Sequence, residues 1–348
     1  MKRWNFGIVG AGLIADFHAR AIADIPNACL RAVCDPNRDK ANGLAKKFSC
    51  KAFDSHKEML EDGEVDILTI ATPSGFHMEP TLDAAGAGKH VICEKPLEIT
   101  LPRLDAMIEA HKDAGTKLGC IFQSRFNNAL TPLRDAIRQG RLGTITHIGI
   151  YVPWWRANEY YKDSWHGTWK LDGGGALMNQ AIHIVDTLCE FGPPVQFVQA
   201  FTSSVGHDGL VETEDTTVAT LQFANGALGS IYATTASWPG LPRRFEITGT
   251  QGTIIYQDDS YTCFQFAKEL PQDKEVLEKY GKTKHASGPS DPAAFTPAMH
   301  TECFKAFINS IESGCEFIIN GREARKSVEL ILAVYESART GKKVAVNQ

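Results

Sequence analysis

The sequence predicts an α/β fold, with a doubly wound parallel sheet at the N-terminus and an α+β domain after it. Three observations predict this fold. The first third of the chain alternates short apolar runs with helix-like patterns. A glycine-rich turn lies between the first apolar run and the first helical pattern. The pattern changes after about Phe122, and the five strand-like runs between residues 196 and 257 follow one another without intervening helices, which is typical of an antiparallel sheet.

The N-terminal third has the pattern of a parallel sheet that helices cover on both faces. Its strand-like runs are residues 5–10, 30–35, 65–72, 90–94 and 117–123. The helix-like segments between them are residues 14–24, 38–48, 56–60, 77–87 and 101–114. Because crossovers between parallel strands are right-handed, this order predicts a Rossmann domain, which we expect over residues 1–123.

The remainder, residues 124–348, is expected to form one α+β domain. Its strand-like runs are residues 144–152, 196–203, 216–223, 226–235, 243–249 and 253–257, with hairpin-type turns at 224–226 and 250–252. Its helix-like segments are residues 129–139, 176–191, 298–313 and 324–340. Residues 268–297 show little periodicity; they could form a lid over a cleft, but a surface excursion is the favoured interpretation.

Composition and charge narrow the class of protein. Of 348 residues, 43% are hydrophobic and 22% are charged, and the net charge is −5. This balance is typical of a globular protein and gives no electrostatic reason to expect a nucleic acid or a membrane as partner. The nine cysteines are scattered, without a CxxC pair, which favours reduced thiols and a cytoplasmic protein.

The turn after the first strand predicts a dinucleotide site. Its sequence, GAGLIA, is a GxGxxA pattern formed by Gly10, Gly12 and Ala15, with Leu13 and Ile14 opening the helix. Gly10 allows the tight turn, Gly12 lets the backbone approach a pyrophosphate, and Ala15 keeps the helix close to the sheet. The helix N-terminus then offers free N–H groups to the phosphates.

The end of the next strand predicts which dinucleotide binds. Asp35 lies twenty positions beyond Ala15, where a carboxylate accepts hydrogen bonds from the ribose hydroxyls and repels a 2′-phosphate. NAD is therefore favoured over NADP. NADP stays possible because Arg38 could contact a 2′-phosphate or stack on adenine. The competing interpretation is that Asp35 is only a turn residue before Pro36.

Further residues fall at the carboxyl ends of the predicted strands, the edge where ligands of such sheets bind. The loop residues Thr72, Pro73, Ser74 and His77 come at and after the end of the run 65–72, and Glu94 and Lys95 at and after the end of 90–94. Gln123 ends the domain, and Arg125 lies just after the last strand. All except Arg125 are expected to contact the cofactor, although Ser74 and His77 could equally cap the next helix. A partly desolvated lysine can also give or take a proton, so Lys95 is a catalytic candidate.

A second group of polar residues follows the run Gly173-Gly174-Gly175. If residues 176–191 form one helix, Asn179, His183 and Asp186 lie on the same face. A triple glycine before a helix suggests close approach of the backbone to a ligand. A lone histidine in such a place is more often an ordinary hydrogen-bonded residue, so the spacing by itself leaves both interpretations open.

In this order, the motifs GAGLIA, CEKP and GGGALMNQAIHIVD resemble those of the Gfo/Idh/MocA oxidoreductase family, which includes glucose–fructose oxidoreductase and inositol dehydrogenases. The resemblance covers essentially the whole chain. It implies a second domain with an open, mostly antiparallel sheet that often forms the oligomer interface, and hence a homodimer or homotetramer. It also implies a cis bond before Pro96, contacts of Lys95 with nicotinamide and substrate, and a proton-relay role for His183.

One position departs from the family pattern. The family commonly has an aspartate four residues before the histidine, and this chain has Asn179, which can orient a substrate but cannot exchange a proton. Similar enzymes that act on sugar nucleotides also carry asparagine there. Proton transfer would therefore fall to Lys95 and His183, with Asn179 as the third catalytic residue.

An aromatic stretch lies between the two motif regions. Trp155, Tyr160 and Trp165 could pack against the apolar face of a sugar ring, or could equally fill the space between domains. By resemblance we place them in the substrate site. The complete predicted substrate set is Lys95, Arg125, Trp155, Tyr160, Trp165, Asn179 and His183.

The sequence therefore predicts an oxidoreductase that transfers a hydride between NAD(P) and a secondary hydroxyl of a sugar, a sugar derivative or a cyclic polyol. Two alternatives stay open: an NAD-dependent glycosidase without net redox change, and a catalytically silent NAD-binding regulator. No metal site is predicted, because the eleven histidines show neither HxxxH nor HExxH spacing.

Overall fold

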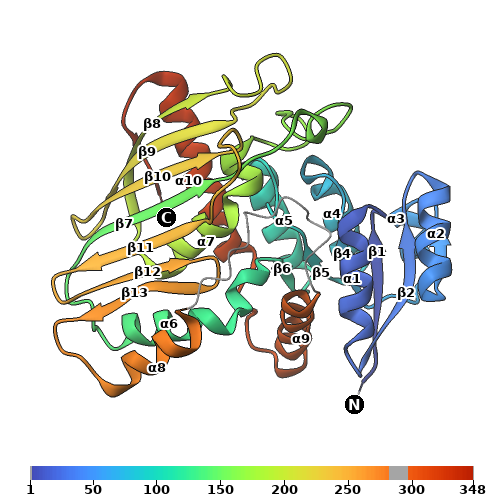
Figure 1. Ribbon diagram of the computed structural model, residues 1–348. Helices are drawn as coiled ribbons and strands as arrows, with labels where there is room; N and C mark the ends of the chain where they lie inside the picture. Colours follow the sequence, from blue (N-terminus) through green and yellow to red (C-terminus); the bar gives the residue numbers. More distant parts are fainter. Residues whose placement is uncertain (1, 282–296, 348) are drawn as a thin grey trace. The chain divides into compact units, whose positions relative to one another are not determined.

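A computed structural model of the chain describes residues 2–281 and 297–347 (Figure 1). These residues form two compact units, one made of residues 2–126 and 297–325 and the other of residues 127–281 and 326–347. The sequence assigns 124–348 wholly to the second domain, whereas residues 297–325 cluster with the first unit. No helix among the described residues is both long enough and apolar enough to cross a membrane.

The first unit is built on a six-stranded parallel sheet. Its strands are β1 (Trp4–Val9), β2 (Ala28–Cys34), β3 (Lys51–Phe53), β4 (Ile67–Ile70), β5 (His90–Cys93) and β6 (Leu118–Cys120). They lie in the order β3-β2-β1-β4-β5-β6. The strand order reverses between β1 and β4, which is where a doubly wound sheet binds its ligand. The prediction missed only β3, whose three residues are too few to show a period.

Six helices belong to this unit. They are α1 (Leu13–Ala23), α2 (Arg38–Phe48), α3 (His56–Glu61), α4 (Met78–Gly86), α5 (Leu101–Asp113) and α9 (Ala298–Ser313). Helix α9 comes from the C-terminal part of the chain and packs on α1. Phe304 and Phe307 of α9 are fully buried, which explains why this segment clusters with the parallel sheet.

The second unit is built on an eight-stranded sheet. Its strands are β7 (Ile145–Pro153), β8 (Val195–Ser203), β9 (Thr216–Phe223), β10 (Leu228–Thr234), β11 (Arg244–Gly249), β12 (Gly252–Gln257), β13 (Ser260–Phe266) and β14 (Val344–Ala345). The order is β13-β12-β11-β7-β10-β9-β8-β14, and all neighbours are antiparallel except β7 and β10. The predicted mostly antiparallel sheet is therefore confirmed.

The helices of this unit are α6 (Thr131–Arg138), α7 (Ile182–Phe191), α8 (Pro271–Tyr280) and most of α10 (Gly321–Thr340) (Figure 1). Helix α7 packs on β7 and β11, and α8 packs on β13. The sequence predicted no helix within 268–297, whereas residues 271–280 form α8, which lies mostly exposed at the surface. Its signals were Pro271 in the first turn and Asp273, whose carboxylate accepts the Leu270 N–H at 2.8 Å and pairs with Arg141. The rest of that segment, 282–296, lies outside the described residues.

Candidate cofactor and substrate sites

The glycine turn between β1 and α1 has the predicted construction. Gly10 has a φ of +95°, and a Cβ there would lie 2.8 Å from the carbonyl oxygen of Ala71. Only glycine fits this position. Gly12 is the N-cap of α1, and Ala15 is fully buried where α1 meets the sheet. The turn therefore leaves the first N–H groups of α1 at the carboxyl edge of the sheet.

The carboxylate of Asp35 is tied to this turn. One oxygen accepts the Ala11 N–H at 2.8 Å, and the other accepts the Asn37 N–H at 2.8 Å. The side chain thus has a fixed direction beside the glycine turn, where the ribose of a dinucleotide is expected. Arg38 is exposed and pairs with Asp54 at 3.1 Å.

Two further loops, which follow β4 and β6, also have polar groups for a cofactor. The buried hydroxyl oxygen of Thr72 and the buried side-chain oxygen of Gln123 have no hydrogen-bond partner among the described residues. Orphaned buried polar atoms are rare, and a ligand is one way to satisfy them. The residues present therefore fit a dinucleotide along the glycine turn, Asp35, Thr72 and Gln123.

Ser74 and His77 are buried residues of the loop between β4 and α4. His77 Nε2 lies 3.0 Å from the carbonyl oxygen of Thr72, and Nδ1 lies 2.9 Å from that of Pro96. The ring thus links the loop after β4 to the loop after β5.

Lys95 follows β5 and is half-buried. The peptide bond between Lys95 and Pro96 is cis, as the family resemblance implies. The carboxylate of Glu94 accepts the Lys95 N–H at 3.1 Å. Arg125 lies in the one-turn helix Gln123–Phe126, is buried, and pairs with Glu323 at 3.8 Å.

In the second unit, the triple glycine leads into a π-helical segment, Ala176–Gln180, and α7 begins only at Ile182. The prediction of one helix over 176–191 is therefore wrong. The cause is a wide turn in which the Ala181 N–H reaches the carbonyl oxygen of Ala176 at 2.9 Å. His183 is half-buried in the first turn of α7, and Asp186 is buried with Ser327 Oγ 3.5 Å away.

Glu214 is buried beneath this segment and holds its N-terminus. Its two oxygens accept the N–H groups of Gly175 and Leu177, both at 2.8 Å, and the hydroxyl of Tyr335 at 3.0 Å. A Cβ on Gly175 would overlap the carbonyl oxygen of Glu214. The third glycine is thus required for contact with Glu214, so it gives no support for a ligand at that point.

Asn179 belongs to a polar cluster with Asp172 and His166. Its Nδ2 donates to Asp172 Oδ1 at 2.6 Å and lies 3.2 Å from His166 Nδ1. A carboxylate only accepts hydrogen bonds, so the Asn179 atom that faces Asp172 must be the amide nitrogen. The same nitrogen faces His166, so a neutral His166 must accept a hydrogen bond at Nδ1 and carry its proton on Nε2. Asp172 is buried and also accepts the Gly167 N–H at 2.9 Å.

Two of the predicted aromatic residues lie around this cluster. The ring of Tyr160 stacks on His166 with centroids 4.3 Å apart, and Trp165 contacts the same ring at 4.0 Å. Trp155 instead packs against Trp238 at 5.5 Å. The structure thus brings Tyr160, Trp165 and Asn179 together, and it places Trp155 in a different aromatic contact.

Sequence reasoning missed Asp172, His166 and Glu214. Asp172 directly precedes the triple glycine, which was the one local signal for it. His166 and Glu214 reach the segment from 13 and 39 positions away in the chain, so no helical or strand period relates them to it.

Glu214 gives a pH-dependent prediction. Burial raises its pKa to about 7 although backbone and Tyr335 hydrogen bonds oppose this. In the unfolded chain the pKa of a glutamate is about 4.3. Between about pH 4.3 and pH 7, the Glu214 carboxyl is therefore protonated in the folded state and ionised in the unfolded state. The contribution to stability is full below about pH 4 and is lost as the pH rises through about 7. We therefore expect the Tm advantage of the wild type over Glu214→Gln to shrink between pH 5 and pH 8. An equal Tm difference across that range, measured by calorimetry, would contradict the assignment.

A glycine turn at the switch point of a doubly wound sheet, with unpartnered polar atoms in loops at the same sheet edge, is typical of a dinucleotide-binding protein. Residues 4–122 match the family model described as "Oxidoreductase family, NAD-binding Rossmann fold", and residues 131–255 match the model of the GFO/IDH/MocA C-terminal domain. The chain belongs to the Gfo/Idh/MocA family. The predicted fold class, oxidoreductase class and NAD cofactor are confirmed.

Solved structures and curated relatives agree with this assignment. The WlbA dehydrogenase from Bordetella pertussis, solved with NADH and UDP-GlcNAcA, is 34% identical with a TM-score of 0.91, and the match covers 100% of this chain and 99% of that one. The WlbA dehydrogenase from Chromobacterium violaceum is 30% identical with a TM-score of 0.89, covering 100% and 97%. Levoglucosan dehydrogenase from Pseudarthrobacter phenanthrenivorans is 29% identical over 84% of this chain and 82% of its own length.

Proposed function

We propose that the protein transfers a hydride between NAD and a secondary hydroxyl carbon of a sugar nucleotide, with a UDP-linked amino-sugar uronate as the first candidate. The single observation that carries the substrate class is the full-length similarity to a dehydrogenase solved with UDP-GlcNAcA. The cluster of Asn179, Asp172 and His166, flanked by the Tyr160 ring, supports it, because polar groups beside an aromatic face suit a sugar.

The residues of the chain would divide the work as follows. NAD, when bound, supplies the hydride acceptor, held by the glycine turn, Asp35, Thr72 and Gln123. The Lys95 side chain, as the neutral amine, would accept the proton of the reacting hydroxyl during oxidation and, as the ammonium, would return it during reduction, with His183 as the second group in the relay. Asn179, held by Asp172, would fix a neighbouring hydroxyl of the sugar.

A panel of UDP-sugars, free sugars and inositols, tested with NAD and with NADP at 340 nm, examines this proposal. We expect turnover with UDP-GlcNAcA and NAD, and a much lower rate with NADP because Asp35 opposes a 2′-phosphate. Turnover of a glycoside without net NADH would instead indicate the glycosidase. NADH binding with no turnover across the panel would indicate the regulator.

We also propose that the protein forms a homodimer or homotetramer through the sheet of the second unit. Cross-strand register places Phe201, Val218, Tyr232 and Tyr151 in one row on one face. Phe201 is 75% exposed and Val218 is 50% exposed. The neighbouring row on the other face, Ala200, Ala219, Ile231 and Ile150, is buried. An apolar row on an otherwise open sheet is typical of a surface that a second copy covers.

The double variant Phe201→Glu/Val218→Glu is expected to convert the assembly to monomers in light scattering, because facing copies would bury like charges. Val205→Glu is the control, since Val205 is 82% exposed but lies outside the row. A monomeric wild type, or an unchanged mass in the double variant, would refute this interface.

The nine free cysteines further support the proposal of a reducing, cytoplasmic location.

A further inference from the structure

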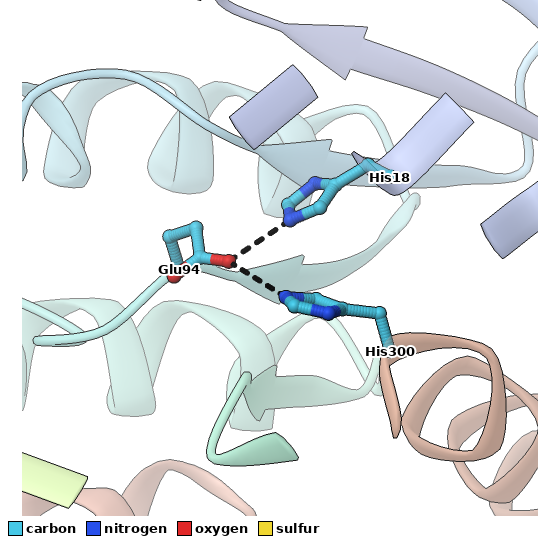
Figure 2. Close-up of side chains that lie close together, drawn as sticks. All are labelled: His18, Glu94 and His300. Atoms are coloured by element: carbon cyan, nitrogen blue, oxygen red, sulfur yellow. Dashed lines mark hydrogen bonds and ion pairs between the residues drawn. The ribbon is translucent and has the colours of Figure 1, made fainter. Parts of the chain in front are cut away.

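Three side chains that are far apart in the sequence meet inside the first unit. His18 comes from α1, Glu94 follows β5, and His300 comes from α9 (Figure 2). His18 Nε2 lies 2.9 Å from Glu94 Oε1, and His300 Nε2 lies 3.7 Å from the same oxygen. His18 is fully buried, His300 is 5% exposed and Glu94 is 8% exposed. A carboxylate this deeply buried is costly unless it is paired and hydrogen-bonded, so the arrangement requires an explanation.

The hydrogen bonds of the cluster have a defined direction. The Thr69 hydroxyl lies 2.9 Å from His18 Nδ1, and Glu94 is on the other side of the ring. A neutral His18 that donates from Nε2 to Glu94 must accept at Nδ1, which the Thr69 hydroxyl satisfies. Burial lowers the pKa of His18, in agreement with the neutral ring. Burial alone would raise the pKa of Glu94, but the contacts with His18 and His300 outweigh it and hold this pKa well below its usual range.

The second oxygen of Glu94 is directed at the next residue. Glu94 Oε2 accepts the Lys95 N–H at 3.1 Å, and Lys95 is the last residue with an amide hydrogen before Pro96. The carboxylate therefore joins the buried histidines to the backbone of the lysine that would hold the reacting hydroxyl.

We propose that His18, Glu94 and His300 form an anchor that fixes the Lys95 backbone and so positions the Lys95 side chain for proton transfer. This inference rests on the proposed function. Glu94 and the two histidines act through Lys95 and are positioning residues. A misplacement of a reacting group by about 1 Å can cost about 100-fold in rate, so an anchor of this kind affects turnover without touching the substrate.

The anchor also explains why α9, from the C-terminal part of the chain, packs in the first unit. His300 of α9 lies against two rings of α1, with ring centroids 5.6 Å from His18 and 6.3 Å from Phe17. Phe304 of the same helix packs edge-on against His18 at 5.3 Å. Helix α9 thus contributes His300 and Phe304 to the packing around His18 and the Glu94 carboxylate.

The same three residues present ligand atoms within 4.8 Å of one another, the arrangement that a metal ion would need. Hydrogen-bonding geometry favours the anchor, because the 2.9 Å separation between His18 and Glu94 is that of a direct hydrogen bond and both Glu94 oxygens already have protein partners. The variant Glu94→Gln distinguishes the anchor from a metal site. A carboxamide oxygen can accept the Lys95 N–H while its NH₂ faces His18, whose tautomer can invert against Thr69, but a carboxamide is a poor metal ligand.

The test is hydrogen exchange at the Lys95 amide in the full-length protein with NADH bound. In Glu94→Ala we expect exchange at Lys95 to accelerate by about tenfold or more, while Ile92 and Cys93 in β5 stay protected. Glu94→Gln should restore most of the protection, and His300→Gln should fall between them. His111→Gln is the matched control, because His111 is equally buried in this unit and bonds Thr116 instead of Glu94.

Steady-state kinetics with UDP-GlcNAcA and NAD complete the test. We expect kcat to fall about 100-fold in Glu94→Ala and about fivefold in Glu94→Gln. Unchanged Lys95 exchange in Glu94→Ala would refute the anchor. A metal ion bound at one per chain in the wild type and lost in His300→Gln would also refute it. Because exchange requires no turnover, an anchor confirmed by exchange but without activity would indicate failure of the proposed function alone.

Discussion

Replacing Lys95 by alanine is expected to lower kcat by about 10³-fold, because the variant loses the group that carries the proton of the reacting hydroxyl. The glycine turn and the groups around Asp35 are untouched, so the variant should still bind NADH, with a Kd raised only by the loss of the contact between Lys95 and the nicotinamide. Stopped-flow measurement of NADH formation with UDP-GlcNAcA gives the first quantity, and quenching of protein fluorescence gives the second.

Two further variants show whether the loss of activity comes from the missing proton-transfer group at Lys95 or from the missing positive charge. Lys95→Arg keeps the positive charge but does not release a proton at accessible pH, so it should be nearly as slow as Lys95→Ala. Lys46→Ala removes an exposed lysine of α2 in the same unit and should behave as the wild type. Full activity in Lys95→Arg would show that charge alone is required, and full activity in Lys95→Ala would remove the proposed mechanism.

The parts of the fold that sequence predicted well are those with local signals. The glycine turn can be predicted because Gly10 must adopt a positive φ next to Ala71, and because the strand and the helix on either side of the turn are only a few residues away. The parallel pairing of β7 with β10 had no such signal, because both strands alternate as antiparallel strands do. The wide turn at Ala176–Gln180 is likewise hidden, since it depends on Glu214 from another element.

The candidate site divides in the same way. Asp35, Lys95 and Asn179 follow recognisable strand ends or a glycine run, so their positions can be predicted from nearby sequence. The partners that hold them come from elsewhere: Glu94 needs His300 from α9, and Asn179 needs His166 from the aromatic stretch. Hydrogen bonds between residues that are distant in the chain leave no period in the sequence, so only the structure reveals them.

Asn179→Asp is expected to destabilise the protein increasingly as the pH rises, even though it restores the aspartate that the family commonly has at this position. Asn179 Nδ2 is 2.6 Å from Asp172 Oδ1, so the variant would face one carboxylate with another. Two carboxylates that close must share a proton, and one pKa of the pair is strongly raised. The unfolded value is about 3.9, so the folded variant must retain a proton that the unfolded chain releases, and its stability falls with pH until that pKa is passed.

We expect the Tm gap between the wild type and Asn179→Asp to be about 5 °C larger at pH 8 than at pH 5. The matched control is the exchange variant Asp172→Asn/Asn179→Asp, which keeps one carboxylate and one carboxamide and should remove the extra pH dependence. If the Tm of Asn179→Asp has the same pH dependence as that of the wild type, the Asp172 carboxylate is not the reason for an asparagine at position 179. If the exchange variant is stable but slow, the carboxylate must lie at Asp172 for catalysis, and the departure from the family pattern is then a relocation of the acid across a hydrogen bond.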